Sequence, residues 1–410
     1  MVMGKENLIV GLDIGTTKIA AIIAELQESG KPKIVGIGTS RSEGLKRGVV
    51  INLEKTVESI NKAVEDAEMM AEVKVNSVFA GIAGDHIRCV NSRGVIAVSR
   101  SGNEILPSDV QRVIDAAKTV GLPTDREIIH VLPQEYTVDD QSGIKDPVGM
   151  SGVRLEAEVH IVTGAVTSAQ NIYRSVKKAG LEVCDLVLQP LASSYALLSP
   201  EEEELGVALI DLGGGTTDIA IFHDGSIRHT AVIGVGSKNV TNDIAIGLRT
   251  SVQQAEEIKK SYGCALSELV DSDEMIKVPG VRGGEPKEIS RSVLAAIIEP
   301  RAEEIFSLIL QEMKKSNYSD LLAAGVVLSG GGSLLEGMVE LAEQIFDLPV
   351  KKGIPQGFNG LVDVASTPIH STGVGLILYG SEQEKDGKSK GSLREKGLFR
   401  RMRNLLSQYF

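Results

Sequence analysis

Near the start of the chain lies the stretch Leu8-Ile9-Val10-Gly11-Leu12-Asp13-Ile14-Gly15-Thr16-Thr17-Lys18-Ile19-Ala20-Ala21-Ile22-Ile23. A second stretch of the same plan lies in the middle of the chain and reads Val207-Ala208-Leu209-Ile210-Asp211-Leu212-Gly213-Gly214-Gly215-Thr216-Thr217-Asp218-Ile219-Ala220-Ile221-Phe222. Each copy predicts two apolar strands joined by a polar turn, with an aspartate where the first strand ends. Because the copies lie too far apart for a short-period repeat, they predict two similar domains that face each other.

The composition predicts a soluble, intracellular chain with a cleft between two or three compact units. At 410 residues the chain exceeds the roughly 150 residues of one ordinary domain. No apolar run approaches the ~20 residues of a membrane span, and the first residues lack a secretory pattern. A net charge of -12 and the absence of tryptophan argue against nucleic-acid binding. The three cysteines predict buried thiols rather than disulfides or a zinc site.

Three glycine-rich loops are candidates for phosphate binding: the two hairpin turns, and a later run between a strand expected at 324–328 and a helix expected near Ser333. Glycines let backbone N–H groups reach phosphate oxygens, and a helix N-terminus favours negative charge. Asp13 and Asp211 are placed to hold a hydrated magnesium ion, and Lys18 to meet the β- or γ-phosphate. The alternative is that all three loops are structural turns. The predicted phosphate-binding residues are Gly15, Thr16, Thr17, Lys18, Gly213, Gly214, Gly215, Thr216, Thr217, Gly330, Gly331 and Gly332.

The two hairpin loops and the late glycine run resemble the phosphate-1, phosphate-2 and adenosine motifs of the actin, sugar-kinase and chaperone ATPase superfamily, over residues 7–380. The resemblance implies an α/β fold of two duplicated, actin-like and ribonuclease-H-like domains, with ATP and Mg²⁺ in the cleft between them. Gln189 resembles the glutamine that positions the attacking water, so Gln189, Asp13 and Asp211 would support an ATPase that is slow at most. A further set of residues fits the pattern of the helix that holds ribose and adenine in that superfamily: Glu256, Lys259 and Lys260. The alternative is that these residues form a solvated face of a helix.

Within that superfamily, four segments resemble the FtsA family of bacterial cell-division proteins: residues 11–18, 44–52, 130–136 and 149–155. The resemblance implies a small inserted subdomain and actin-like self-assembly on the cytoplasmic face of the membrane at the division site. It also implies anchoring of the ring of the tubulin-like protein FtsZ and recruitment of other division proteins. One departure is Val235, which separates Gly234 and Gly236 where many relatives have paired glycines at a phosphate or ribose contact.

The resemblance also suggests domain limits. Residues 158–165 are expected to return to the core as a strand, and an acidic C-terminal FtsZ peptide would suit basic residues in the subdomain over 229–305. The candidates there are Lys287, Arg291 and Arg301, with ordinary surface roles as the alternative. The expected units are a first core (1–84 and 163–198), an inserted subdomain (85–162), a second core (199–228 and 306–380), a subdomain closing over the nucleotide (229–305), a flexible linker (381–396) and a terminal helix (397–410).

The end of the chain has the pattern of an interfacial helix. Its apolar residues fall on one stripe at ~100° per residue, and basic side chains flank that stripe where they can reach lipid headgroups. Residues 385–403 carry an excess of basic side chains, which anionic lipid attracts. The alternative is docking on the body or in a partner's groove. The predicted membrane-contacting residues are Leu398, Phe399, Arg401, Met402, Arg403, Leu405, Leu406, Tyr409 and Phe410.

Two other functions share the predicted fold. A sugar kinase would need a carbohydrate pocket and a catalytic base beside the phosphate loops, and the inserted segment offers no evident sugar site. A pilus-assembly adaptor is expected to lack the lipid-binding helix. The terminal helix therefore favours the membrane-bound cell-division protein.

Overall fold

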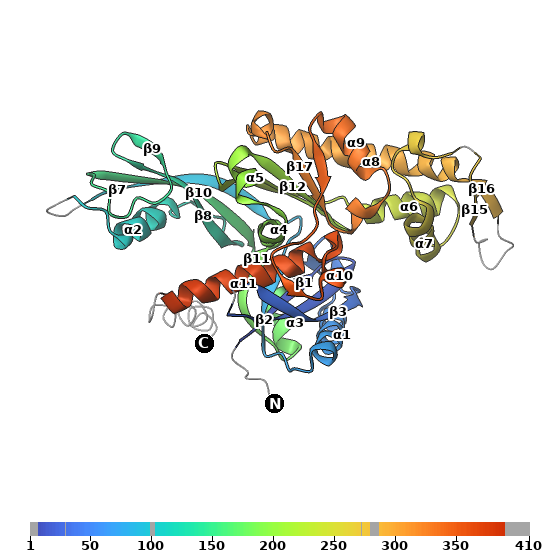
Figure 1. The fold of residues 1–410 in the computed structure, drawn as a ribbon, viewed down its shortest axis with the longest axis horizontal. Helices are drawn as coiled ribbons and strands as arrows, with labels where there is room; N and C mark the ends of the chain where they lie inside the picture. The colour runs from blue at the N-terminus through green and yellow to red at the C-terminus, as the bar shows by residue number, and fades with distance from the viewer. Residues whose placement is uncertain (1–6, 29, 99–102, 272, 279–286, 390–410) are drawn as a thin grey trace.

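The computed structural model describes residues 7–28, 30–98, 103–271, 273–278 and 287–389 (Figure 1). The main sheet of the first half contains three antiparallel strands in chain order, followed by two parallel strands on one side and a short strand on the other. In spatial order these strands are β11 (Glu182–Leu188), β6 (Ser77–Ile82), β1 (Leu8–Ile14), β2 (Lys18–Leu26), β3 (Pro32–Arg41) and β19 (Asn359–Gly360).

The main sheet of the second half repeats this plan. Its three antiparallel strands again follow one another in the chain, and two parallel strands again extend the sheet beyond the first of them. The spatial order is β14 (Ser226–Ile233), β13 (Thr217–His223), β12 (Val207–Leu212), β17 (Val326–Ser329) and β18 (Val350–Lys352). The shared strand order confirms the duplication that the two hairpins predict.

Helices cover both faces of the first sheet, so its central strands are buried throughout and read as continuous apolar runs. Helix α1 (Leu53–Ala71) packs on β2 and β3, and α3 (Val166–Lys178) lies beside it. Asn52 caps α1 by accepting a hydrogen bond from the Lys55 backbone N–H at 3.0 Å. A two-stranded ribbon, β4 (Leu45–Lys46) and β5 (Val49–Val50), precedes this helix.

The inserted subdomain is a four-stranded antiparallel sheet with one helix. Its strands, in spatial order, are β7 (Arg88–Ala97), β10 (Arg154–Ala165), β8 (Arg126–Val138) and β9 (Gln141–Ile144), and α2 (Pro107–Ala117) packs on β7 and β10. The expectation that 158–165 form a core strand is wrong. These residues belong to β10, whose central place in this small sheet buries both of its faces and gives it the apolar run of a core strand.

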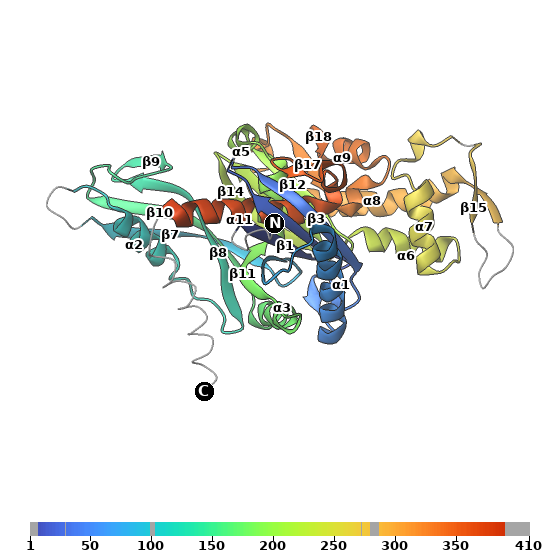
Figure 2. The same ribbon diagram turned by 60° about the horizontal axis from the view of Figure 1, so that its bottom comes forward.

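A second subdomain projects from the opposite end of the molecule, and Figures 1 and 2 agree on this placement. It contains helices α6 (Ser237–Gly247) and α7 (Val252–Tyr262) and the hairpin of β15 (Met275–Val278) and β16 (Lys287–Ser290). The long helix α8 (Arg291–Lys315) connects this subdomain to the second half, where α5 (Pro200–Leu205) and α9 (Met338–Phe346) pack.

Two helices cross at the junction of the halves. Helix α4 (Gln189–Leu197) leads from the first half to the second, and α11 (Ser371–Ser389), which follows the short α10 (Val362–Ala365), returns to pack on β1. A Cβ on Gly375 would lie 1.8 Å from the Ala192 carbonyl oxygen, so only glycine permits this crossing. The flexible linker expected from residue 381 is wrong at its start, because α11 continues to Ser389. Within the described ranges, no helix has the length and apolar character needed to cross a membrane.

We predict that Gly375→Ala lowers the free energy of unfolding by about 2–3 kcal/mol, because the added methyl meets an immovable backbone carbonyl. The matched control is Gly373→Ala in the same helix, where the nearest atom is the flexible Ile22 Cδ1 at 2.7 Å. Its effect should stay below about 1 kcal/mol, since the gain in helix propensity offsets a small side-chain shift. Urea unfolding measures both changes, and equal losses would contradict the crossing as the constraint.

Candidate functional site

The two glycine–threonine loops meet at the junction of the halves. Residues 15–17 join β1 to β2, and residues 213–216 join β12 to β13. A Cβ on Gly214 would lie 1.7 Å from Thr17 Oγ1, and one on Gly215 would lie 2.7 Å from Thr16 Cγ2. Only glycine allows this approach, so each half contributes one loop to a single site.

Three carboxylates gather behind these loops. Asp13 and Asp211 end β1 and β12, and Asp218 lies near the start of β13. Desolvation raises the pKa of Asp211 to about 7, with the charge of Asp13 as the second cause. Burial also raises the pKa of Asp13 and, more strongly, that of Asp218. Such a concentration of acid groups favours a bound cation.

The carboxylates fit a hydrated magnesium ion better than a directly coordinated metal. In the described part of the chain, no group of three or more His, Cys, Asp or Glu side chains is arranged to hold a metal directly. Mg²⁺ keeps several waters and needs one or two carboxylates. Asp218 Oδ1 is buried and, among the described residues, has no hydrogen-bond partner. Asp218 is not among the residues predicted for this site, although it follows the threonines at the position where the first copy has Lys18.

Lys18 points to the same site. Its Nζ donates a hydrogen bond to the Ile369 carbonyl oxygen at 2.6 Å and lies 4.0 Å from Asp13 Oδ2. Burial lowers the pKa of Lys18, and the charges of Asp13 and Asp211 oppose that shift. Burial and then Lys18 lower the pKa of the neighbouring His370 to about 4, so its imidazole is neutral at pH 7.

Gln189, the first residue of α4, lies against the acid cluster. Its Nε2 donates a hydrogen bond to Asp13 Oδ1 at 3.1 Å. From the other crossing helix, Thr372 Oγ1 donates to Asp211 Oδ2 at 3.4 Å. Both helices of the crossing therefore begin in contact with the site.

The third glycine loop also adjoins the carboxylates. Gly330 has φ +79°, and a Cβ there would lie 2.3 Å from Asp211 Oδ1. The helix expected near Ser333 begins later, at Met338. Residues 331–334 form a single 3-10 turn, and an extended Leu335 and a left-handed Gly337 precede α9.

Comparison with known proteins identifies the family. A family model described as "Cell division protein FtsA" matches residues 208–375, and one described as "SHS2 domain inserted in FTSA" matches residues 84–163. The cell division protein FtsA of Pseudomonas aeruginosa is 53% identical over 383 residues, which cover 93% of this chain and 91% of that protein. The chain belongs to the FtsA family. The FtsA of Escherichia coli K12 is 41% identical over 392 residues, which cover 94% of this chain and 93% of that protein.

Solved structures share the fold of this FtsA-family chain. The PilM–PilN type IV pilus biogenesis complex matches with a TM-score of 0.67 at 15% identity, covering 91% of this chain and 98% of that one. MreB5 of Spiroplasma citri bound to ADP matches with a TM-score of 0.58 at 16% identity, covering 94% of this chain and 100% of that one. The MamK double helical filament matches with a TM-score of 0.51 at 12% identity, covering 91% of this chain and 98% of that one. These likenesses confirm the actin-like α/β fold, and the family model over residues 84–163 confirms the inserted subdomain. Membership of the FtsA family sets aside a sugar kinase or a pilus adaptor.

The segment between β14 and α6 closes the second loop of the FtsA site. The backbone N–H of Ser237 donates to Gly213 O at 2.9 Å, and that of Lys238 donates to Gly214 O at 2.9 Å. A Cβ on Gly236 would lie 2.6 Å from Gly213 O, whereas Gly234 faces the side chain of Arg47 instead. Gly236 therefore supports the loop directly.

Lys238 is a second residue of the site that was not predicted. Its Nζ donates to the Thr16 carbonyl oxygen at 3.1 Å, so it joins the second half to the loop of the first. Burial lowers the pKa of Lys238, with Arg41 as the next cause. A lysine directly after the Gly-Val-Gly-Ser run was the available signal.

The three residues expected at ribose and adenine lie on α7. Glu256 Oε2 accepts a hydrogen bond from Lys259 Nζ at 2.7 Å, and Lys259 Nζ also donates to Thr241 Oγ1 at 2.8 Å. These contacts hold α7 against α6. Lys260 lies at the surface, 3.6 Å from Glu256 Oε1. Their role toward a nucleotide stays a prediction.

The predicted partner residues have contacts within the chain. Arg291 pairs with Glu274 and Glu336, and Arg301 pairs with Asp243 and Glu304. Lys287 begins β16. The predicted membrane residues, all within 397–410, lie outside the described residues.

We predict that the stability of the FtsA-family chain falls as pH rises from about 4 to about 7. Aspartate ionises near 3.9 when unfolded, whereas Asp211 has a folded pKa of about 7. The folded state therefore binds more protons in this window, so raising the pH favours unfolding by up to about 1.4 kcal/mol per unit.

Urea unfolding with a chelator and no nucleotide, at pH 4.5 to 7.5, tests this prediction. Asp211→Asn should make the profile less steep, because the amide does not titrate while the other two carboxyls of the site still do. The matched control, Asp363→Asn at an exposed position, should leave the profile unchanged. Parallel profiles for the wild type and Asp211→Asn would contradict the prediction.

Proposed function

We propose that this FtsA-family protein binds ATP with Mg²⁺ between its halves and assembles into actin-like filaments on the cytoplasmic face of the membrane at the division site. There it anchors the FtsZ ring and recruits other division proteins. The observation that carries this proposal is the contact of two glycine–threonine loops beside three carboxylates with raised pKa. The family supports the role in cell division.

The residues of the site fall into two groups: those that donate hydrogen bonds to phosphate, and the acids that hold the metal ion. The loop N–H groups, the threonine hydroxyls and the Lys18 ammonium supply hydrogen bonds to phosphate oxygens. Asp13 and Asp211 hold Mg²⁺ through its waters, and the ion when bound neutralises phosphate charge. Gln189, held by its bond to Asp13, orients a water toward the terminal phosphate. Hydrolysis is slow at most, and the site acts as a switch for assembly.

Related folds support both nucleotide binding and assembly. The MreB5 structure contains ADP, and the MamK structure is a double helical filament. In the present protein, Lys238 and Thr16 connect the halves beside the loops, so a phosphate group there would hold them in one closed arrangement. A single closed arrangement favours a repeating contact between copies.

The terminal segment supplies the membrane attachment. Its apolar stripe and flanking arginines suit the interface of an anionic bilayer. One short helix binds lipid weakly, but several copies held in a filament bind together with much greater strength. The C-terminal FtsZ peptide docks on the subdomain over 229–305, where it competes with the acidic partners of Arg291 and Arg301.

We predict that Lys18→Ala and Asp211→Ala each weaken binding of Mg²⁺-ATP by at least about tenfold, because each removes a charged partner of the phosphates or their ion. Titration calorimetry measures the change. The control is Lys118→Ala at the C-cap of α2, where the lysine pairs with Asp115 at the surface. Wild-type affinity in both site variants would refute the nucleotide site.

We predict that removal of residues 397–410 abolishes co-sedimentation with vesicles that contain anionic lipid, because the apolar stripe is then lost. A second variant, in which Arg401 and Arg403 become glutamate, should bind weakly and with little dependence on salt. Full binding by the truncated chain would show that attachment lies elsewhere.

A further inference from the structure

The inserted subdomain contacts both halves of the molecule. It leaves the first half after β6, near Gly84, and rejoins it at α3. On that side, the Leu188 backbone N–H donates to His130 Nε2 at 3.0 Å. Leu188 directly precedes Gln189, whose amide contacts Asp13. One side of the subdomain is therefore two residues from the acid cluster.

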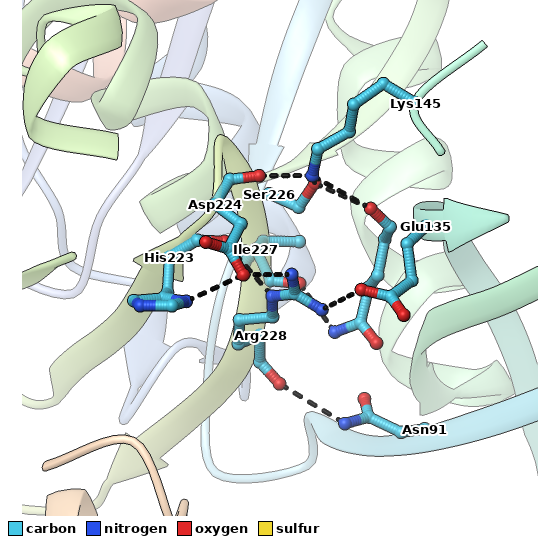
Figure 3. Close-up of polar contacts among 9 residues, drawn as sticks. Asn91, Glu135, Lys145, His223, Asp224, Ser226, Ile227 and Arg228 are labelled. Carbon is cyan, nitrogen blue, oxygen red and sulfur yellow. Dashed lines mark hydrogen bonds and ion pairs between the residues drawn. The ribbon is translucent and has the colours of Figure 1, made fainter. Parts of the chain in front are cut away.

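On its other side the subdomain grips the turn between β13 and β14 (Figure 3). Lys145 Nζ donates to Ser226 Oγ at 3.0 Å, to the Gln134 carbonyl oxygen at 3.2 Å and to the Asp224 carbonyl oxygen. Gln134 Nε2 in turn donates to the Ile227 carbonyl oxygen at 2.8 Å. We call these contacts, with those of Arg228 below, the joint.

Arg228 completes the joint from the hairpin. Its guanidinium is buried at 5% exposure; Nε donates to the His223 carbonyl oxygen and Nη2 to Asp224 Oδ2, each at 3.0 Å. Nη1 lies 3.5 Å from Glu135 Oε2 of the subdomain. Asn91 Nδ2 donates to the Arg228 carbonyl oxygen at 3.4 Å. Charge-assisted bonds of this kind fix one geometry.

The hairpin of β13 and β14 contacts the subdomain at its turn and has its other end at the phosphate loops. Strand β13 begins at Thr217, directly after the second loop, and ends at His223 in the joint. Strand β14 returns to Ile233, after which Gly236 supports the same loop. The hairpin spans about 20 Å at ~3.4 Å per residue. Its pairing is continuous apart from one irregularity between Ile221 and Phe222.

We propose that the β13–β14 hairpin transmits the occupancy of the phosphate loops to the inserted subdomain through the joint. A phosphate group drawn between the loops shifts the root of the hairpin, and the joint carries that shift into β8 and β9. The coupling is reciprocal, so a partner bound to the subdomain alters nucleotide affinity by the same factor. This inference rests on the nucleotide binding proposed above.

Amide hydrogen exchange of the full chain, with and without Mg²⁺-ATP, tests the coupling. In the wild type, ATP should slow exchange at residues 213–217 and, about threefold or more, at residues 136–144. Lys145→Met, which keeps the stem of the side chain but loses its three bonds, should retain the first effect and lose the second. The control Lys118→Met, at the C-cap of α2 in the same subdomain, should behave as the wild type.

The outcomes separate the two proposals. Protection at 213–217 without any change at 136–144 in the wild type, or both effects in Lys145→Met, would overturn the coupling while leaving nucleotide binding intact. No protection at 213–217 in any variant would refute nucleotide binding, and with it the coupling. Should Lys145→Met fail to fold, Ser226→Ala removes the hydroxyl that contacts both Lys145 and Gln134 and takes its place.

Nucleotide-free samples test the joint itself. Without ATP, Lys145→Met should speed exchange at residues 224–228 and 136–144 by about tenfold, because bonds from an ammonium ion are lost. Unchanged exchange at both segments would show that the joint does not hold the subdomain, and would overturn the coupling.

Discussion

The close approach of the two glycine–threonine loops governs the rest of this structure. Gly214 and Gly215 lie against Thr17 and Thr16, and side chains at these glycines would force the halves apart. The contact brings three carboxylates together, with Asp13 and Asp218 buried and Asp211 partly buried, which is unfavourable without a compensating charge. The crossing of α4 and α11 fixes the halves in this position, and its own tight point is again a glycine. Stability and ligand binding thus depend on the same few backbone positions.

Much of the fold and part of the site can be predicted from local sequence. The hairpins identify themselves because strand periodicity, glycine turns and terminal aspartates are local, and the structure places Asp13, Asp211 and Lys18 together. Thr372 could not be found in this way, since its contact with Asp211 depends on a neighbour distant in the chain. The glycine run before Lys238 marks that lysine, but its contact with Thr16 in the other half cannot be read from local sequence. The assignment of 158–165 failed for a related reason: a strand buried on both faces reads the same in any sheet.

The inserted subdomain is more than an appendage of the first half. Its chain connections join it to the first half, and its polar contacts join it to the second half. Its position therefore depends on both halves. The buried guanidinium of Arg228 would be costly without partners, and its bonds to the β13–β14 turn and Glu135 offset that cost. Such a site has a defined geometry and resists gradual distortion.

Helix α11 has a consequence for how the terminal segment leaves the body. Its nineteen residues span about 28 Å at 1.5 Å each, and in both ribbon views it runs toward the side of the inserted subdomain (Figure 2). Tyr379 bonds Asp185 and Lys385 bonds Gly30, so the rod is docked along the first half. The docked helix therefore fixes where the described part of the chain ends, at Ser389. Copies stacked in register would place the ends of their α11 helices along one edge at regular intervals.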